Sequence, residues 1–341
     1  MHCFCQVVLI TLEIRKLNSM RGIAAFIVLL THFSDATGWL EGRLGGRAGQ
    51  YGVMLFFLLS GFLMAYLYLD LPFTKTAVKR YALARAGRVL PLFLLVVLIS
   101  FFGPYIGTSS FYELSDWPYF LSHLLFLEGE SVLWSVAPEI HFYAIFIGLW
   151  FLASWRPGYL YLLIAASMVL LFLLNFPRPH GTFLGIPYDF HLFRSLPYFF
   201  VGLLMGKHYK SFHIPEYMKS HWYVLALLLI PLLYPDFTPV KSSANFKMWL
   251  HYEVLFVMAT VFFCVTFLVP DDNKLLANKA GDFIGKVSYS LYLLHMPVLY
   301  YVNKLELQIE LKLFTFVAVS LLVACVSFHF IEKPLARIIK R

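Results

Sequence analysis

The stretch QYGVMLFFLLSGFLMAYLYLD, residues 50–70, carries no charged side chain before Asp70 at its end. About 20 apolar residues form an α-helix long enough to cross the hydrocarbon core of a bilayer. Similar stretches lie on both sides of it, at residues 19–36, 89–106, 132–154, 159–176, 191–206, 221–235, 249–269, 284–302 and 312–330. These runs are continuously apolar, whereas the strands of a membrane barrel alternate, so they predict helices. We expect an all-α, polytopic membrane helix bundle with about ten transmembrane helices.

The composition indicates the same class of protein. Hydrophobic residues make up 60% of the chain and charged residues only 13%, whereas soluble domains carry about 25% charged residues. Lipid accepts apolar side chains around the whole circumference of a helix, which water does not. No polar stretch is long enough for a second folded domain. We therefore expect one transmembrane domain over residues 1–341, with a short interfacial leader at 1–18 and a basic tail at 331–341.

The distribution of positive charge indicates the orientation. With ten spans and a cytoplasmic N-terminus, most of the 27 Lys and Arg residues fall on the cytoplasmic side. The loop 107–131, on the other side, has no Lys or Arg. Within it, residues 117–128 are too few to cross, so we expect a surface or re-entrant helix there. Both termini are predicted to be cytoplasmic, and the net charge of +8 then reflects topology and does not imply a nucleic-acid partner.

The four cysteines do not suggest a metal site. Cys3 and Cys5 lie near the start, Cys264 and Cys325 lie inside apolar stretches, and none forms a Cys-x-x-Cys pair. We interpret them as free thiols that fill apolar space.

Arg21 and His32 are the first ionisable pair inside a predicted span, where such residues are costly and are functional candidates. Their separation of eleven residues is close to three helical turns, so both lie on one helix face. A histidine can take a proton from a hydroxyl group and return it. The alternative is a histidine that only packs helices together, with Arg21 as a topology anchor.

Two further polar stripes lie inside predicted spans. Ser135, Glu139 and Tyr143 follow each other at intervals of four residues in WSVAPEIHFY, and Ser288, Tyr292 and His295 share a face in SYSLYLLH. The buried carboxylate needs a partner, such as His32 or an arginine. The alternatives are a structural ion pair for the first stripe and interhelical hydrogen bonds for the second.

Arginines mark both ends of the predicted bundle. Arg80, Arg85 and Arg88 lie in the cytoplasmic stretch KRYALARAGRVLP, and guanidinium groups suit phosphate oxygens. Contact with lipid phosphates would explain them equally well. Arg194 begins another span near the outer face, where it could hold a substrate anion or a lipid headgroup.

Taken together, these residues resemble the membrane acyltransferase-3 family, the O-acyltransferases of bacterial polysaccharide modification. The resemblance is carried by six motifs in the family's order: RGIAAFIVLLTH (21–32), FFLLSGFLMAY (56–66), RAGRVLP (85–91), WSVAPEIHFY (134–143), SYSLYLLH (288–295) and FIEKPL (330–335). The one departure inside a motif is Pro138 before Glu139, where a proline is expected to kink the helix.

The resemblance implies a multi-pass enzyme of the bacterial inner membrane that takes an acyl group, usually acetyl, from acetyl-coenzyme A on the cytoplasmic side. It implies a carbohydrate or lipid-linked glycan acceptor, membrane lipid as a partner, no metal, and Arg21 with His32 as the essential pair. Because the chain ends at Arg341, it is similar to family members without an appended hydrolase-like domain.

The resulting hypothesis gives each residue a role. Arg85 and Arg88, with Arg80, hold the coenzyme A phosphates. His32 is the general base or carries the acyl group covalently, Glu139 fixes the imidazole tautomer, and Arg21 polarises or holds the donor. The residues that line the cavity are Ser135, Tyr143, Arg194, Ser288, Tyr292 and His295.

Three alternatives to a glycan acyltransferase stay open from the sequence. An acyltransferase could act on a small molecule that is not a glycan. A proton-coupled transporter would also need His, Glu and Arg inside the membrane, although the chain lacks paired half-repeats. A lipid scaffold without chemistry would not need the clustered ionisable residues.

Overall fold

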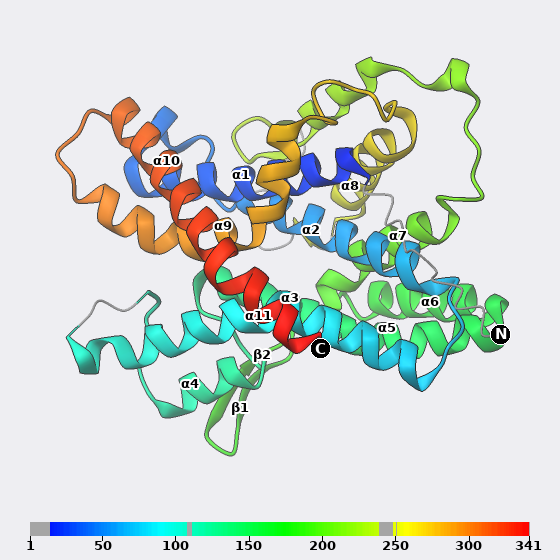
Figure 1. Ribbon diagram of the computed structural model, residues 1–341, viewed down its shortest axis with the longest axis horizontal. Helices are drawn as coiled ribbons and strands as arrows, with labels where there is room; N and C mark the ends of the chain where they lie inside the picture. The colour runs from blue at the N-terminus through cyan, green and yellow to red at the C-terminus, as the bar shows by residue number, and fades with distance from the viewer. Residues whose placement is uncertain (1–13, 108–110, 239–247, 250, 341) are drawn as a thin grey trace, which may run out of the picture.

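The computed structural model describes residues 14–107, 111–238, 248–249 and 251–340 (Figure 1). Most of the predicted leader, together with Cys3 and Cys5, therefore lies outside the described residues. The α-helices are α1 (Arg15–Thr37), α2 (Gly49–Met64), α3 (Lys75–Phe102), α4 (Trp117–Leu124), α5 (Val136–Trp155), α6 (Pro157–Leu173), α7 (Leu192–His208), α8 (Tyr252–Phe263), α9 (Lys279–Asn303), α10 (Ile309–Ser327) and α11 (Lys333–Ile339).

Shorter helical segments extend or connect these helices. Wider π-helical turns continue α2 at Ala65–Leu69, α8 at Cys264–Leu268 and α10 at Phe328–Glu332. Tighter 3₁₀ turns occupy Trp39–Gly42, Gly103–Ile106, Ser131–Ser135, Glu216–Met218, His221–Leu229 and Pro231–Leu233. Every stretch predicted as a span is therefore at least partly helical within the described residues.

The prediction of an all-α membrane protein is confirmed in its main feature. Among the described residues, five helical segments are long and apolar enough to cross a bilayer: Arg15–Thr37, Gly49–Leu69, Lys75–Tyr105, Ser131–Trp155 and Ile309–Ile339. Three apolar helices are shorter, at Pro157–Leu173, His221–Leu233 and Tyr252–Leu268. The number of ten crossings and the cytoplasmic position of both termini stay predictions. The eight residues of α4 are too few to cross, in agreement with the surface or re-entrant helix expected there.

Helix boundaries follow local capping chemistry. The Thr74 hydroxyl accepts a hydrogen bond from the backbone N–H of Ala77 at the start of α3, and the Asn278 side chain accepts one from Gly281 at the start of α9. The prediction that Pro138 kinks its helix is wrong. Because α5 begins at Val136, Pro138 lies in the first turn, where backbone N–H groups have no partner inside the helix.

Helix α2 lies near the middle of the molecule, packed against α1 and α7 (Figure 1). Its contact with α7 is backbone to backbone. A Cβ atom added to Gly61 would lie 2.0 Å from the Phe199 carbonyl oxygen, and one added to Gly202 would lie 2.0 Å from that of Leu58. Only glycine permits such close packing, a common device between membrane helices. The pairing fixes the position of Ser60, one residue before Gly61.

Helix α1 packs between α2 and α9, and α10 packs against α9 and also contacts α1 through Phe33 and Phe316. A second close contact joins α1 to the start of α9, where the Ser19 hydroxyl donates to the Leu276 carbonyl and Arg15 pairs with Asp282 at 2.8 Å. This pairing sets the register between His32 on α1 and His295 on α9.

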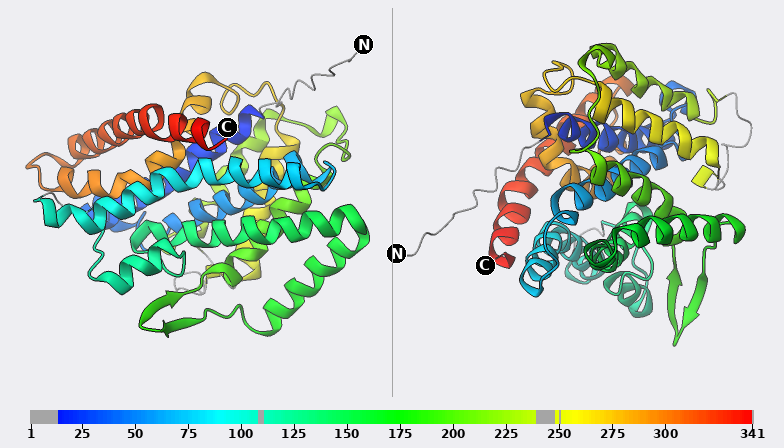
Figure 2. Two further views of the ribbon diagram at one scale, coloured as in Figure 1. Left: turned by 60° about the horizontal axis from the view of Figure 1, so that its bottom comes forward. Right: turned by 90° about the vertical axis from the view of Figure 1, so that its right-hand side faces the viewer.

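The sequence prediction missed one small sheet. Strands β1 (His180–Phe183) and β2 (Ile186–Asp189) pair antiparallel, with His180 opposite Asp189, and the hairpin projects from the helical body (Figure 2). The turn between them uses Leu184 and Gly185, both with positive φ, as tight hairpins require. Nearby, α6 exposes most of its apolar side chains, for example Leu162 at 65% and Phe172 at 63%, as a helix that faces lipid would.

Candidate functional site

Two cavities lie next to each other inside the helix bundle. The first, which we call the arginine cavity, is lined by Arg21, Arg85, Arg88 and Glu139 among others. The second, the histidine cavity, is lined by His32, with Asp35, Arg47 and Trp134. Tyr292 lines both cavities. Most of the polar residues singled out in the sequence therefore gather in one region from α1, α3, α5 and α9, and Arg80 and Arg194 are the exceptions.

The arginine cavity brings together three of the four arginines that the hypothesis assigns to donor binding. Arg21 comes from α1, and Arg85 and Arg88 come from adjacent turns of α3. The Arg85 guanidinium lies 5.8 Å from the centre of the Tyr68 ring, and its buried Nε atom has no hydrogen-bond partner among the described residues. Arg80 does not line this cavity and is exposed. A polyanion that enters would meet three guanidinium groups.

Glu139 lies in the arginine cavity and not beside His32. Its Oε1 atom accepts hydrogen bonds from the Ser60 hydroxyl at 2.8 Å and from the Tyr143 hydroxyl. Ser135, Glu139 and Tyr143 all line this cavity, as their spacing predicts. In this structure Glu139 therefore does not fix the tautomer of His32, contrary to the hypothesis. Its carboxylate instead faces the cavity that contains the arginines.

His32 is oriented by a second histidine. The Nδ1 atom of His32 lies 2.9 Å from Nε2 of His295, and the two rings stack with centroids 5.1 Å apart. The Nδ1 atom of His295 lies 2.8 Å from the Tyr292 carbonyl oxygen. A carbonyl oxygen can only accept, so Nδ1 of His295 carries the hydrogen and its Nε2 accepts from Nδ1–H of His32. The Nε2 atom of His32 then carries a lone pair, as a general base requires.

Of the second stripe, Ser288 and Tyr292 line the arginine cavity, whereas buried His295 reaches His32. The Ser288 hydroxyl donates to the Gly285 carbonyl at 2.9 Å, which is a contact within its own helix. The Tyr292 hydroxyl accepts from the Ser135 hydroxyl at 2.8 Å and donates to the Val132 carbonyl at 3.0 Å. Tyr292 therefore joins α9 to the start of α5 between the two cavities.

Arg194 lies outside both cavity linings and packs against two indole rings. Its guanidinium carbon lies 4.9 Å from the ring centre of Trp134 and 5.4 Å from that of Trp249, and the side chain is 7% exposed. Such cation–π contacts stabilise the charge and the position of the rings. Because Trp134 also lines the histidine cavity, Arg194 supports a wall of that cavity.

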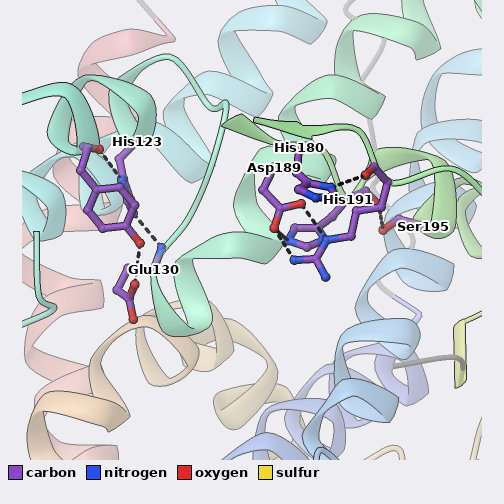
Figure 3. Close-up of polar contacts among 8 residues, drawn as sticks. His123, Glu130, His180, Asp189, His191 and Ser195 are labelled. Atoms are coloured by element: carbon purple, nitrogen blue, oxygen red, sulfur yellow. Dashed lines mark hydrogen bonds and ion pairs between the residues drawn. The ribbon is translucent and has the colours of Figure 1, made fainter. Parts of the chain in front are cut away.

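A polar cluster next to Arg194 anchors the hairpin. Arg178 Nε donates to Asp189 Oδ1 at 2.7 Å, and the His191 imidazole lies 3.3 Å from the other Asp189 oxygen (Figure 3). Burial acts to raise the pKa of the Asp189 carboxyl, but the hydrogen bond and charge of Arg178, with the neighbouring His191, hold it below its ordinary value. The His191 ring packs edge-on against Trp134 at 4.9 Å, which connects the hairpin to the histidine cavity.

His123 belongs to a separate cluster (Figure 3). Its ring accepts from the backbone N–H of Glu130 at 2.7 Å and donates to the Tyr119 carbonyl at 2.8 Å. Nδ1 bonds within α4, whereas Nε2 ties α4 to the segment that precedes α5. This histidine is therefore structural.

Sequence reasoning missed several residues of the histidine cavity. Asp35 lies one helical turn after His32, a spacing that could have indicated it. Trp134 was noted only as part of a motif. Arg47 and Ser131 also line the cavity, and both are non-glycine residues with positive φ, at 76° and 50°. Backbone strain of this kind is often found at functional sites, but the sequence of a loop gives no sign of it.

Comparison with known proteins finds relatives that align over most of this chain. A family model described as an acyltransferase domain matches residues 14–331. The O-acetyltransferase OatA of Staphylococcus aureus strain NCTC 8325 / PS 47 and that of strain COL are each 23% identical to this chain over 354 aligned positions. The alignment covers 94% of this chain and 57% of each relative, so the chain spans a little over half the relatives' length. No solved structure matches it at a significant level.

The chain belongs to the membrane acyltransferase-3 family of enzymes. The match includes every cavity residue described above, and it confirms the resemblance drawn from the six motifs. Membership in an acyltransferase family favours acyl transfer over the transporter and scaffold alternatives.

Proposed function

We propose that this protein is a membrane O-acetyltransferase that transfers an acetyl group from acetyl-coenzyme A to a hydroxyl group of a carbohydrate. The observation that carries the proposal is the shared wall between the two cavities. Arginines suited to a polyphosphate lie on one side of Tyr292, and a histidine whose Nε2 carries a lone pair lies on the other. A donor bound by its phosphates and an acceptor hydroxyl beside His32 would thus be close neighbours.

The donor binds in the arginine cavity by its phosphate groups. Arg85 and Arg88 offer planar guanidinium groups that suit phosphate oxygens better than lysine does. Arg21 lies in the same cavity on the helix that also carries His32, and it holds or polarises the thioester end. Under the predicted topology this cavity is reached from the cytoplasm, where acetyl-coenzyme A is made.

In the chemical step, Nε2 of His32 takes the proton of the acceptor hydroxyl as its oxygen attacks the thioester carbonyl carbon. A carbon–oxygen bond forms, the carbon–sulfur bond breaks, and the proton passes from His32 to the departing thiolate. The hydrogen bond from Nδ1–H of His32 to His295 strengthens while His32 is an imidazolium. His295 is thus a positioning residue. It takes the place beside the catalytic histidine that a carboxylate often occupies in other enzymes.

The acceptor binds in the histidine cavity. This cavity offers the ring of Trp134 together with Asp35, Arg47 and Gln50. Aromatic rings next to hydrogen-bonding side chains suit the apolar faces and hydroxyl groups of sugars. The curated relatives are named as O-acetyltransferases, which supports a hydroxyl acceptor. A glycan linked to a lipid carrier in a bacterial inner membrane would be presented at the depth in the membrane where this cavity lies.

The test is the O-acetyl content of purified surface glycans, measured by NMR, in cells with the wild-type gene, a deletion and His32→Ala. We expect the acetyl signals to be absent from the deletion and from the variant, with equal amounts of protein in the membrane. Unchanged glycans in all three strains would contradict a glycan acceptor. A small-molecule acceptor would then appear as a coenzyme-A-dependent acetylated metabolite lost with His32→Ala, and a transporter would produce none.

A further inference from the structure

Among the described residues, Val53 and Tyr292 are the two that line both cavities. Val53 lies on α2 and is 4% exposed, and Tyr292 lies on α9 and is 6% exposed. The direct route from the arginine cavity to His32 therefore runs past these two side chains.

The Tyr292 side chain is held across this route by its ring and its hydroxyl. Its ring packs edge-on against Phe56 with centroids 5.8 Å apart. Its hydroxyl is bound by Ser135, which lines the arginine cavity, and by the carbonyl of Val132, which lines the histidine cavity. Two neutral hydrogen bonds of this kind hold a side chain in place but are weak enough to break and re-form during turnover.

We propose that the Tyr292 side chain is the gate between the donor and acceptor cavities, and that with Val53 it sets the largest acyl group that can reach His32. The inference rests on the proposed function. An acetyl group is narrow enough to pass when the phenol swings aside. Each further methylene needs space that the ring of Tyr292 and the methyl groups of Val53 occupy.

The main chain and the side chain of Tyr292 have separate tasks, which makes the gate testable. The main-chain carbonyl accepts the hydrogen bond that orients His295, whereas only the side chain divides the cavities. Tyr292→Ala therefore removes the gate and leaves the backbone oxygen that fixes the histidine pair.

The experiment uses the full-length protein in lipid nanodiscs, with the acceptor glycan identified by NMR. The rates of free thiol release from acetyl-, propionyl- and butyryl-coenzyme A are compared for the wild type, Tyr292→Ala and Val53→Ala. In the wild type we expect acetyl to be preferred over butyryl. In Tyr292→Ala the ratio of kcat/KM for butyryl to that for acetyl should rise by about tenfold or more, since one or two methylenes in a tight pocket commonly discriminate by this amount.

The control variants separate gating from general damage. Val53→Ala enlarges the same passage from the opposite helix and must shift the ratio in the same direction, which keeps the test decisive if Tyr292→Ala does not fold. Tyr301→Ala truncates an exposed tyrosine on the same helix, away from both cavities, and should leave the ratio unchanged.

The failures of the two proposals are distinguishable. A wild-type protein that transfers acetyl, with folded Tyr292→Ala and Val53→Ala variants that keep the wild-type acyl preference, would overturn the gate and leave the proposed function standing. A wild-type protein that releases no coenzyme A from any of the three donors would overturn both.

Discussion

The imidazole of His32 donates from Nδ1 to Nε2 of His295, over 2.9 Å and between residues 263 positions apart in the chain. The contact joins α1 to α9 and depends on their close packing. It leaves the lone pair on the second nitrogen of His32, at the wall of the histidine cavity. His32, the orienting His295 and the neighbouring arginine cavity are thus assembled by helices α1, α2, α3, α5 and α9.

His295→Ala should lower kcat by about 100-fold, as removal of a group that assists proton transfer commonly does. The KM for acetyl-coenzyme A should change little, because His295 does not line the arginine cavity. His295→Gln should restore part of the rate, since its amide oxygen can accept from Nδ1–H of His32. Steady-state kinetics and the pH–rate profile of the three proteins check this. Equal losses in the Ala and Gln variants, with an unshifted pH profile, would indicate a purely structural role.

Arg88→Ala and Arg85→Ala should each raise the KM for acetyl-coenzyme A by about 10- to 100-fold, as expected for a charge-assisted hydrogen bond to phosphate. Arg80→Ala is the matched control. It removes an exposed arginine of the same helix that does not line the cavity, and it should leave KM unchanged. Donor binding measured by titration calorimetry checks both. If Arg80→Ala weakens binding as much as Arg88→Ala, the cavity is not where the phosphates bind.

Gly202→Ala should destabilise the protein by about 2 kcal/mol or more, because the new Cβ would lie 2.0 Å from the Leu58 carbonyl oxygen and would force α2 and α7 apart. Gly148→Ala on α5 is the matched control, since its Cβ would meet nothing within 4 Å and alanine favours helix. Thermal unfolding of the detergent-solubilised proteins distinguishes them. A wild-type melting temperature for Gly202→Ala would contradict the close packing of α2 against α7.

The hairpin should loosen in acid. The ion pair with Arg178 holds the pKa of Asp189 below its ordinary value of 3.8. A lowered carboxyl pKa contributes stability above the unfolded pKa, and this is lost as the pH falls through the folded pKa. Amide exchange in β1 and β2, corrected for intrinsic rates, should be constant from pH 5 to 8 and rise below about pH 4.

Arg178→Gln is the control for the acid response. This variant should raise amide exchange in the hairpin at neutral pH by a few-fold at most, because a partly exposed ion pair contributes about 1 kcal/mol or less. It should also weaken the rise in exchange below about pH 4. An acid response of unchanged size in Arg178→Gln would assign the effect to another group.

The sequence was informative about helices and about which polar residues matter. Apolar runs locate helices because both lipid and the protein core accept such residues, and spacing placed Ser135, Glu139 and Tyr143 on one face. Contacts between helices could not be predicted in the same way. Glu139 accepts from Ser60 on another helix, 79 residues earlier, and the partner of His32 is His295. Both pairs depend on glycine contacts and helix register, which the spacing within one helix does not specify.

Local chemistry explains the other differences between the sequence predictions and the structure. Pro138 does not kink α5 because the helix begins only two residues earlier, which the continuous apolar run conceals. The hairpin at His180–Asp189 was missed because it is short and because Pro179 and Pro187 suggest an irregular loop. Arg47 and Ser131 reach the histidine cavity because their backbone has positive φ. This conformation cannot be predicted from the sequence when the residue is not glycine.

The most direct test of the central claim uses the purified protein in lipid nanodiscs with acetyl-coenzyme A labelled in the acetyl group. The transfer of label to an isolated glycan acceptor is compared between the wild type and His32→Ala. We predict label in the glycan, with one free coenzyme A thiol released for each acetyl transferred, for the wild type and at least about 100-fold less for His32→Ala. Equal labelling by both proteins, with His32→Ala folded and binding the donor normally, would contradict the role of His32 as the general base and with it the proposed mechanism of acetyl transfer.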